Sequence, residues 1–205
     1  MKFLFVLLVA VSFLASCKKK GISYTIEGTV TDQAFNSPGN GVLVQLYQTA
    51  AGSGELTLAQ STTTGSDGTY SFKVDREKIE HYQLSFTKMH YFPATVDFTL
   101  EDLDPKESNV YNVNVIAKSW VKLIFLNADG LGSIKITKTH GKTNCFECCS
   151  FTDYVITDQY ETIMDCMNDG NTLFSYHWFI PQTPTNGEES AITAPLDTTE
   201  IVLSY

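Results

Sequence analysis

The stretch Ser66-Asp67-Gly68-Thr69-Tyr70-Ser71-Phe72 is the clearest structural signal in this sequence. Asp67-Gly68 supplies the positive-φ residue that a tight hairpin turn requires, and Tyr70 and Phe72 then alternate with polar residues, so they share one face of a strand. Short runs rich in Val, Ile, Thr, Tyr and Phe recur between turn residues after residue 21, and none shows a sustained helical period. The sequence therefore predicts an all-β protein.

Seven strands are predicted in the first half of the chain. They fall near residues 23–31, 41–48, 56–63, 69–74, 82–88, 92–99 and 109–116, a number that suits a sandwich of two sheets. The segment 75–80 is expected to form one turn of helix between two of these strands, because it is too short to make a stable helix alone.

A second set of strands is predicted from Trp120 to the C-terminus. It comprises the runs WVKLIFLN (120–127), SIKITKT (133–139), FTDYVITD (151–158), ETIMDCMN (161–168), TLFSYHWFI (172–180) and TEIVLSY (199–205). The alternation in Ile134-Lys135-Ile136 places the lysine on a solvated face and the aliphatic side chains in a core. We therefore expect two β-sandwich domains, residues 23–117 and 118–205. No Pro or Gly linker lies between them, so the connection is expected to be short and stiff. The alternative to two domains is a single larger sandwich.

A set of residues spread through the first half carries a family resemblance: Gly28-Thr29-Val30-Thr31-Asp32, Pro38, Gly41, Val42, Val44, Leu46, Thr64, Asp67-Gly68-Thr69-Tyr70-Ser71-Phe72 and Tyr82-Gln83-Leu84. Through them, residues 22–116 resemble the carboxypeptidase regulatory-like domain, a transthyretin-type (prealbumin/Ig-like) sandwich of seven strands. Gly28 is expected to mark a bulge or a close backbone approach in the first strand. That family is a binding and spacing scaffold, so the resemblance implies an architecture and no catalytic residues.

The N-terminus reads as a targeting signal. One lysine precedes an apolar run from Phe3 to Ala15, which is shorter than the roughly 20 residues of a membrane-spanning helix, so residues 1–16 are expected to be a signal peptide. The segment Leu14-Ala15-Ser16-Cys17 resembles the lipobox of bacterial lipoproteins, which implies lipidation of Cys17 and a short linker over 17–22. The alternative to lipidation is an ordinary secreted protein whose signal peptide is cleaved near Cys17.

These signals predict a location in the cell envelope of a Gram-negative bacterium. The partner there would be a membrane, reached through the lipid anchor, and we expect the outer membrane, with its periplasmic or surface face left open. The net charge of −9 has the wrong sign for holding a phosphate backbone, so nucleic acid is not an expected partner. A second partner, either an envelope protein or a carbohydrate, is left open by the sequence.

Four cysteines remain beside Cys17, and they pose the main chemical question. Cys145, Cys148, Cys149 and Cys166 are an even number in an oxidising compartment, which favours structural disulfides over a zinc or redox site. Cys145 and Cys148 have CxxC spacing, but a zinc ribbon requires a second such pair. Bridging the adjacent Cys148 and Cys149 is geometrically unfavourable, so Cys166 is expected to bond to Cys149 or Cys148, with Cys145 taking the other.

Recognisable catalytic patterns are absent from the sequence. The four histidines lack a metal-ligand spacing, no GxSxG motif occurs, and neither a metal nor a cofactor is expected. Phe174, Tyr176 and Trp178 would share one face of a strand, where Tyr176 and Trp178 could stack on a sugar, although core packing is the simpler reading. We therefore expect a non-catalytic binding or structural module. The alternatives are a carbohydrate-binding accessory protein and an envelope enzyme whose site is scattered through the sequence.

Overall fold

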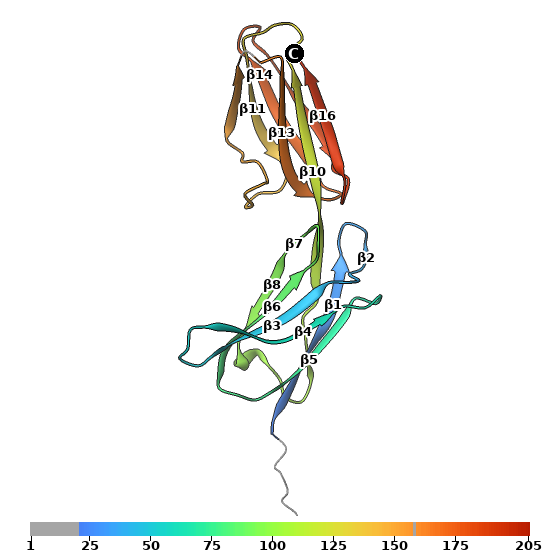
Figure 1. Cartoon of the computed structure of the whole chain (residues 1–205), viewed down its shortest axis with the longest axis vertical. Coiled ribbons are helices and arrows are strands. Elements are labelled where there is room, and N and C mark those ends of the chain that lie inside the picture. Colours follow the sequence, from blue (N-terminus) through green and yellow to red (C-terminus); the bar gives the residue numbers. More distant parts are fainter. Residues whose placement is uncertain (1–20, 158) are drawn as a thin grey trace, which may run out of the picture.

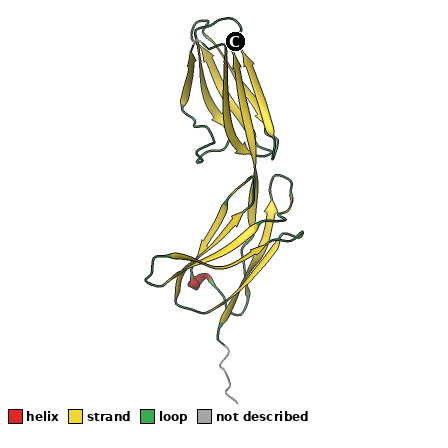
Figure 2. Ribbon diagram, viewed as in Figure 1, coloured by secondary structure: helices red, strands yellow, loops and turns green. Residues whose placement is uncertain are grey.

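The computed structural model describes residues 21–157 and 159–205, which fold as two β-sandwich units placed end to end (Figures 1 and 2). Alternating buried and exposed residues along the strands produce two separate hydrophobic cores. The predicted all-β sandwich architecture is confirmed. No helix among the described residues is long and apolar enough to cross a membrane.

The first unit is built around β1, which pairs with strands on both of its edges. β1 runs antiparallel to β5 and parallel to β9 and β10, and the sheet β4-β3-β6-β8 faces it. The strands are β1 (Ser23–Asp32), β2 (Ser37–Pro38), β3 (Leu43–Ala50), β4 (Leu56–Thr63), β5 (Thr69–Asp75), β6 (Ile79–Thr87), β7 (Tyr91–Phe92), β8 (Ala94–Phe98), β9 (Ser108–Val110) and the start of β10 (Val113–Leu126).

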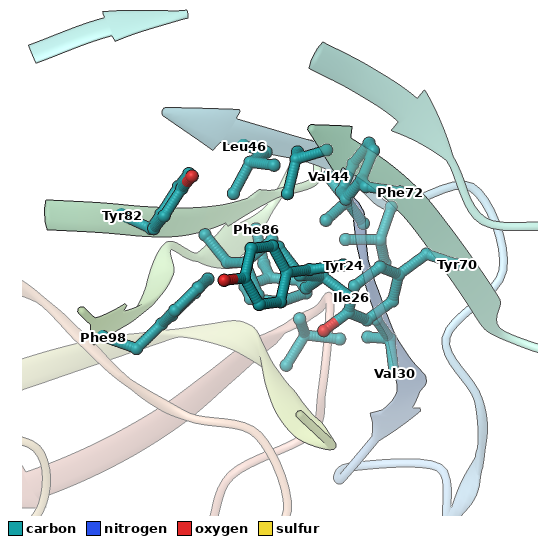
Figure 3. Close-up of a cluster of buried hydrophobic side chains, with 14 of the residues drawn as sticks. Tyr24, Ile26, Val30, Val44, Leu46, Tyr70, Phe72, Tyr82, Phe86 and Phe98 are labelled. Atoms are coloured by element: carbon teal, nitrogen blue, oxygen red, sulfur yellow. The ribbon is translucent and has the colours of Figure 1, made fainter. Parts of the chain in front are cut away.

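Aromatic and branched aliphatic side chains from these sheets fill the first core (Figure 3). The rings of Tyr82 and Phe98 stack with their centroids 5.4 Å apart, and Tyr70 meets Phe86 edge-on at 5.5 Å. Tyr70 and Phe72 both point into this core, as their alternation predicts. Buried aromatic pairs of this kind add to the stabilisation from apolar burial alone.

Gly28, Gly68 and Thr64, which belong to the family-like sequence pattern, each have an identifiable structural role. A Cβ at Gly28 would overlap the carbonyl oxygen of Tyr111, so the predicted close backbone approach is confirmed. Gly68 has a φ of 73°, as the predicted hairpin turn requires. The buried Thr64 hydroxyl donates to the Gly39 carbonyl at 2.5 Å and accepts from the Val42 amide at 2.9 Å, which joins two loops of the first unit.

Three details of the predicted strand pattern are wrong. The helical turn at 75–80 does not form, because Ile79 begins β6 and is buried in the core; the described helical element is a 3₁₀ turn, η1 (Leu100–Asp102). The strand predicted at 92–99 is divided by Pro93, which lacks an amide donor, into β7 and β8. The predicted strand 109–116 is divided between β9 and β10.

A single strand crosses from one core to the other. In β10, Val115 and Ala117 are buried in the first core, whereas Val121, Leu123 and Phe125 are buried in the second. The boundary predicted at 117/118 thus lies inside a continuous strand, and the expected stiff connection is this backbone rather than a linker. Whether the two units are independent domains stays a prediction.

The second unit packs the sheet β13-β10-β16 against the sheet β12-β11-β14-β15. Its further strands are β11 (Ser133–His140), β12 (Asp153–Thr157), β13 (Glu161–Asp169), β14 (Leu173–Ile180), β15 (Thr185–Ile192) and β16 (Thr198–Ser204). β15 was not predicted, because its sequence TNGEESAI is poor in strand-forming residues. Eight paired positions with β14 nevertheless hold it in the sheet, and Gly187 leaves room for the Trp178 ring beside it.

Candidate functional site

The disulfide-bridged loop, residues 141–152, connects β11 to β12 at the end of the second unit that faces the first (Figure 1). Cys145 is bonded to Cys148, and Cys149 is bonded to Cys166 on β13. This is one of the two pairings that the sequence left open. The Cys148 amide donates to the Cys145 carbonyl at 3.2 Å, so the first disulfide spans a hydrogen-bonded turn.

Backbone contacts dock this loop onto the adjacent sheet. The Met167 amide of β13 donates to the Glu147 carbonyl at 2.7 Å, one residue after the Cys166 bridge. Asn144 and Cys149 have positive φ angles of 62° and 46°, and they flank the bridged turn on its two sides. The loop is therefore held in one conformation by covalent bonds and hydrogen bonds together.

A buried lysine, Lys138, lies directly beneath the bridged loop. Its ammonium group donates to the carbonyls of Lys142 at 2.5 Å, Cys148 at 2.6 Å and Cys149 at 3.2 Å. Three acceptors match the three N–H bonds of an ammonium ion, while burial lowers the pKa of this lysine from its ordinary value. The Phe174 and Phe151 rings lie 5.4 and 5.0 Å from the nitrogen.

The sequence contains a signal for the burial of this lysine. Ile134, Ile136 and Lys138 occur at every second position of β11, so the strand period places Lys138 on the core face with the two isoleucines. A charged residue on a core face requires compensating polar partners. The carbonyls of the disulfide-bridged loop supply them.

Aromatic side chains line a groove on the outer side of the loop. Phe146, inside the bridged turn, is fully exposed with a relative accessibility of 105%, and Phe151 is 42% exposed. The groove encloses about 410 Å³ and is lined by Thr143, Asn144, Cys145, Phe146, Cys149, Ser150, Phe151 and Tyr154. A fully exposed phenylalanine on a covalently closed turn gains no stability from the fold, so it is available for contact with a partner.

A second, larger groove also borders residues 143–144. It has a volume of about 680 Å³ and is lined by His140, Gly141, Lys142, Thr143, Asn144, Asp169, Thr172 and Leu173. The Lys142 ammonium pairs with Asp169 at 2.7 Å and lies 4.1 Å from the centroid of Phe92 on β7. This contact joins the loop to the first unit.

Of the two aromatic residues predicted as possible ligand contacts, Tyr176 lies inside the core and is inaccessible, whereas contact of Trp178 with a ligand stays a prediction. Tyr176 is 1% exposed, and Trp178 is half-buried against the second core. Burial raises the pKa of the Tyr176 hydroxyl, and neither this hydroxyl nor Trp178 Nε1 has a hydrogen-bond partner among the described residues. Their face of β14 points inward because Phe174, on the same face, fills the sandwich interior.

The arrangement that comes nearest to a catalytic constellation lies on the outer face of β11, β14 and β15. The Ser175 hydroxyl contacts Thr139 Oγ1 at 2.6 Å and His140 Nδ1 at 2.9 Å, and Thr139 donates to Glu188 at 3.0 Å. Hydrogen bonds from Ser175 and Thr139 lower the pKa of Glu188. Ser175 has no solvent exposure, so its hydroxyl cannot reach a substrate, and the network serves to order polar groups on the sheet.

No cluster of three His, Cys, Asp or Glu side chains suited to a metal ion occurs within residues 21–157 and 159–205. His81 pairs with Asp97 at 2.9 Å on the surface of the first unit, and the His90 ring packs on Trp120 at 5.5 Å. The predicted lipidation site, Cys17, lies outside the described residues.

Sequence comparison identifies the first unit. Residues 25–115 match the family model of the carboxypeptidase regulatory-like domain. The match confirms the resemblance predicted from Gly28, Thr64 and Asp67-Gly68, and it ends before the disulfide-bridged loop. No curated protein matches the sequence.

The comparison with solved structures gives matches at low sequence identity. The shaft pilin SpaA from Lactobacillus rhamnosus GG is 12% identical over 89% of this chain and 97% of its own, with a TM-score of 0.37. A 3-chlorocatechol 1,2-dioxygenase from Rhodococcus opacus 1CP (14%, TM-score 0.36) and the Bacillus anthracis TIE protein (13%, TM-score 0.39) align over 48% and 89% of this chain. The chain spans 61% of the length of that dioxygenase and 34% of the TIE protein.

Proposed function

We propose that this chain is a lipid-anchored, non-catalytic binding module of a Gram-negative cell envelope, located at the outer membrane. The lipobox-like segment ending at Cys17 supplies the anchor, and the carboxypeptidase regulatory-like unit acts as a spacer. The disulfide-bridged loop of the second unit is the binding surface.

The observation that carries this proposal is the arrangement of the two units. The described chain begins at the end of the first unit that is remote from the second (Figure 1). β10 then continues from one core into the other with hydrogen bonds on both edges, including Gly170 N to Ala117 O at 2.8 Å and Leu196 N to Lys118 O at 2.8 Å. An anchor at Cys17 would therefore hold the second unit away from the membrane on a stiff support.

The absence of enzymatic activity is part of the proposal and rests on the chemistry of the described residues. The serine of the His140–Ser175 pair is inaccessible, and the grooves beside the loop lack two coupled carboxylates. An exposed aromatic side chain on a rigid turn, with two grooves bordering the same loop, is a feature of binding surfaces.

The anchor is tested by Cys17→Ala, expressed with the signal segment intact in a Gram-negative host. The variant is expected to leave the membrane fraction and to incorporate no radiolabelled palmitate, because acylation requires the Cys17 sulfur. Lys20→Ala, which keeps that sulfur, serves as the matched control and should remain with the membrane. Unchanged fractionation and labelling of Cys17→Ala would show that the anchor assignment is wrong.

A further inference from the structure

The two disulfides of the second unit have different surroundings. Cys166 is 1% exposed and belongs to the second core, so the Cys149–Cys166 bridge joins the loop to that core. The Cys145–Cys148 bridge lies within the loop itself and spans a sequence separation of only 3. Cys145 is partly exposed beside the aromatic groove, whereas Cys148 is buried. The shorter bridge thus combines one accessible residue with one buried residue.

From this arrangement we propose that Cys145–Cys148 is a thiol–disulfide exchange site, which takes a peptide segment carrying a cysteine next to an apolar side chain. The thiolate of the peptide attacks Cys145 Sγ and forms a new S–S bond. The bond between Cys145 and Cys148 breaks, and its electron pair leaves on Cys148 Sγ. The proton released when the peptide thiol ionised is taken up by Cys148, so one thiol and one disulfide are exchanged for another thiol and disulfide without an external oxidant.

The Lys138 ammonium is bound to the backbone carbonyl of Cys148, the cysteine that leaves. Its nitrogen lies 2.6 Å from the Cys148 carbonyl and 3.2 Å from the Cys149 carbonyl, which places a positive charge beside the leaving sulfur's own backbone. A nearby cation stabilises a thiolate and makes it a faster leaving group, while burial of Cys148 acts in the opposite direction. Glu147, the neighbouring acid, is exposed and therefore opposes this effect less than a buried carboxylate would.

The groove beside Cys145 defines the peptide that it accepts. Phe146 and Phe151 present apolar rings on the same groove that Cys145 and Tyr154 line. An apolar side chain adjacent to the incoming cysteine would contact these rings while the thiolate approaches Cys145 Sγ. The site therefore distinguishes peptides by the residue next to the cysteine.

This activity goes beyond the proposed role as a membrane-tethered binding module and does not depend on lipidation of Cys17. The exchange is reversible, because the Cys148 thiol can attack Cys145 Sγ in the mixed disulfide, reform the original bridge and release the peptide thiol. A failed exchange test would leave the anchoring proposal intact, and loss of anchoring would leave the exchange chemistry intact.

The test uses the oxidised full chain and two peptides, Ac-Gly-Phe-Cys-Gly-NH₂ and Ac-Gly-Ser-Cys-Gly-NH₂. Reactions are quenched with acid at timed intervals, and the mixed disulfides are located by non-reducing peptide mapping. We expect adducts on Cys145 to form at least tenfold faster than adducts on Cys149 or Cys166, with the Phe-Cys peptide faster than the Ser-Cys peptide. The second bridge of the same molecule is the internal control.

The variant Phe146→Ala tests the groove, and because Phe146 is fully exposed the substitution leaves the core untouched. It should abolish the preference for the Phe-Cys peptide over the Ser-Cys peptide. Equal reactivity of the two bridges, or no adduct on Cys145, would overturn the exchange site. A peptide preference that survives Phe146→Ala would overturn the assignment of the groove.

Discussion

Removing the Cys149–Cys166 bridge should destabilise the second unit more than removing the Cys145–Cys148 bridge. The two bridges span sequence separations of 17 and 3. On the chain-entropy model, a closed loop of the first size stabilises the folded state by about 3 kcal/mol, and one of the second size by about 2 kcal/mol. Cys166 and Cys148 are both 1% exposed, but only Cys166 belongs to the second core, so its truncation adds a packing loss in the same direction as the loop-length effect.

The assay is urea denaturation of Cys149→Ala/Cys166→Ala and Cys145→Ala/Cys148→Ala beside the parent chain. Tryptophan fluorescence is a suitable probe, because Trp178 packs against the second core and Trp120 lies on the strand that crosses into it. The long-bridge variant is expected to lose about 3 kcal/mol of unfolding free energy and the short-bridge variant about 1 kcal/mol less than that. Circular dichroism at a wavelength dominated by strands provides an independent signal of the same transition.

Equal losses in the two variants, or a larger loss for the short bridge, would refute the loop-length argument. A count of free thiols in the parent chain precedes the comparison. Four titratable thiols in protein exported to the envelope would contradict both bridges, and stoichiometric zinc would contradict them as well.

Three further predictions concern the first unit. Gly28→Ala should cost about 1–3 kcal/mol, because a Cβ there would lie 2.7 Å from the Tyr111 carbonyl carbon, whereas Gly65→Ala, with only a 3.5 Å contact, should be nearly neutral by urea denaturation. Hydrogen bonds, chiefly from Gln83, lower the pKa of Asp97 in the folded state. The ionised carboxylate therefore stabilises the fold at pH values above its unfolded pKa of about 3.9, and this stabilisation is lost as the pH falls through the lower pKa of the folded state. In thermal melts between pH 6 and pH 2, Asp97→Asn should lose less stability on acidification than the parent chain. The same pH dependence in both proteins would contradict a stabilising role of the Asp97 carboxylate. A fragment of residues 21–118 should melt cooperatively by circular dichroism, and an unfolded fragment would show that the second unit completes the first core.

Local sequence patterns determined much of the first unit. The Asp67-Gly68 turn, the close approach at Gly28 and the inward alternation of Tyr70 and Phe72 each follow from chemistry within a few residues. Local patterns do not predict β15, whose polar sequence is held as a strand by its pairing with β14 rather than by its own propensity. They also fail at 75–80, where burial of Ile79 outweighs a weak helical tendency.

The sequence by itself determined the all-β class, the resemblance of the first half to a regulatory-like sandwich, and the limited choice of pairings among the four cysteines. Only the tertiary structure decided which of those pairings forms, because the positions of Cys149 and Cys166 depend on how the loop docks on β13. It alone placed the Lys138 ammonium under the loop and Tyr176 inside the core. A strand's period specifies two faces but not which neighbouring sheet covers each one, and that choice is made by contacts between residues far apart in the sequence.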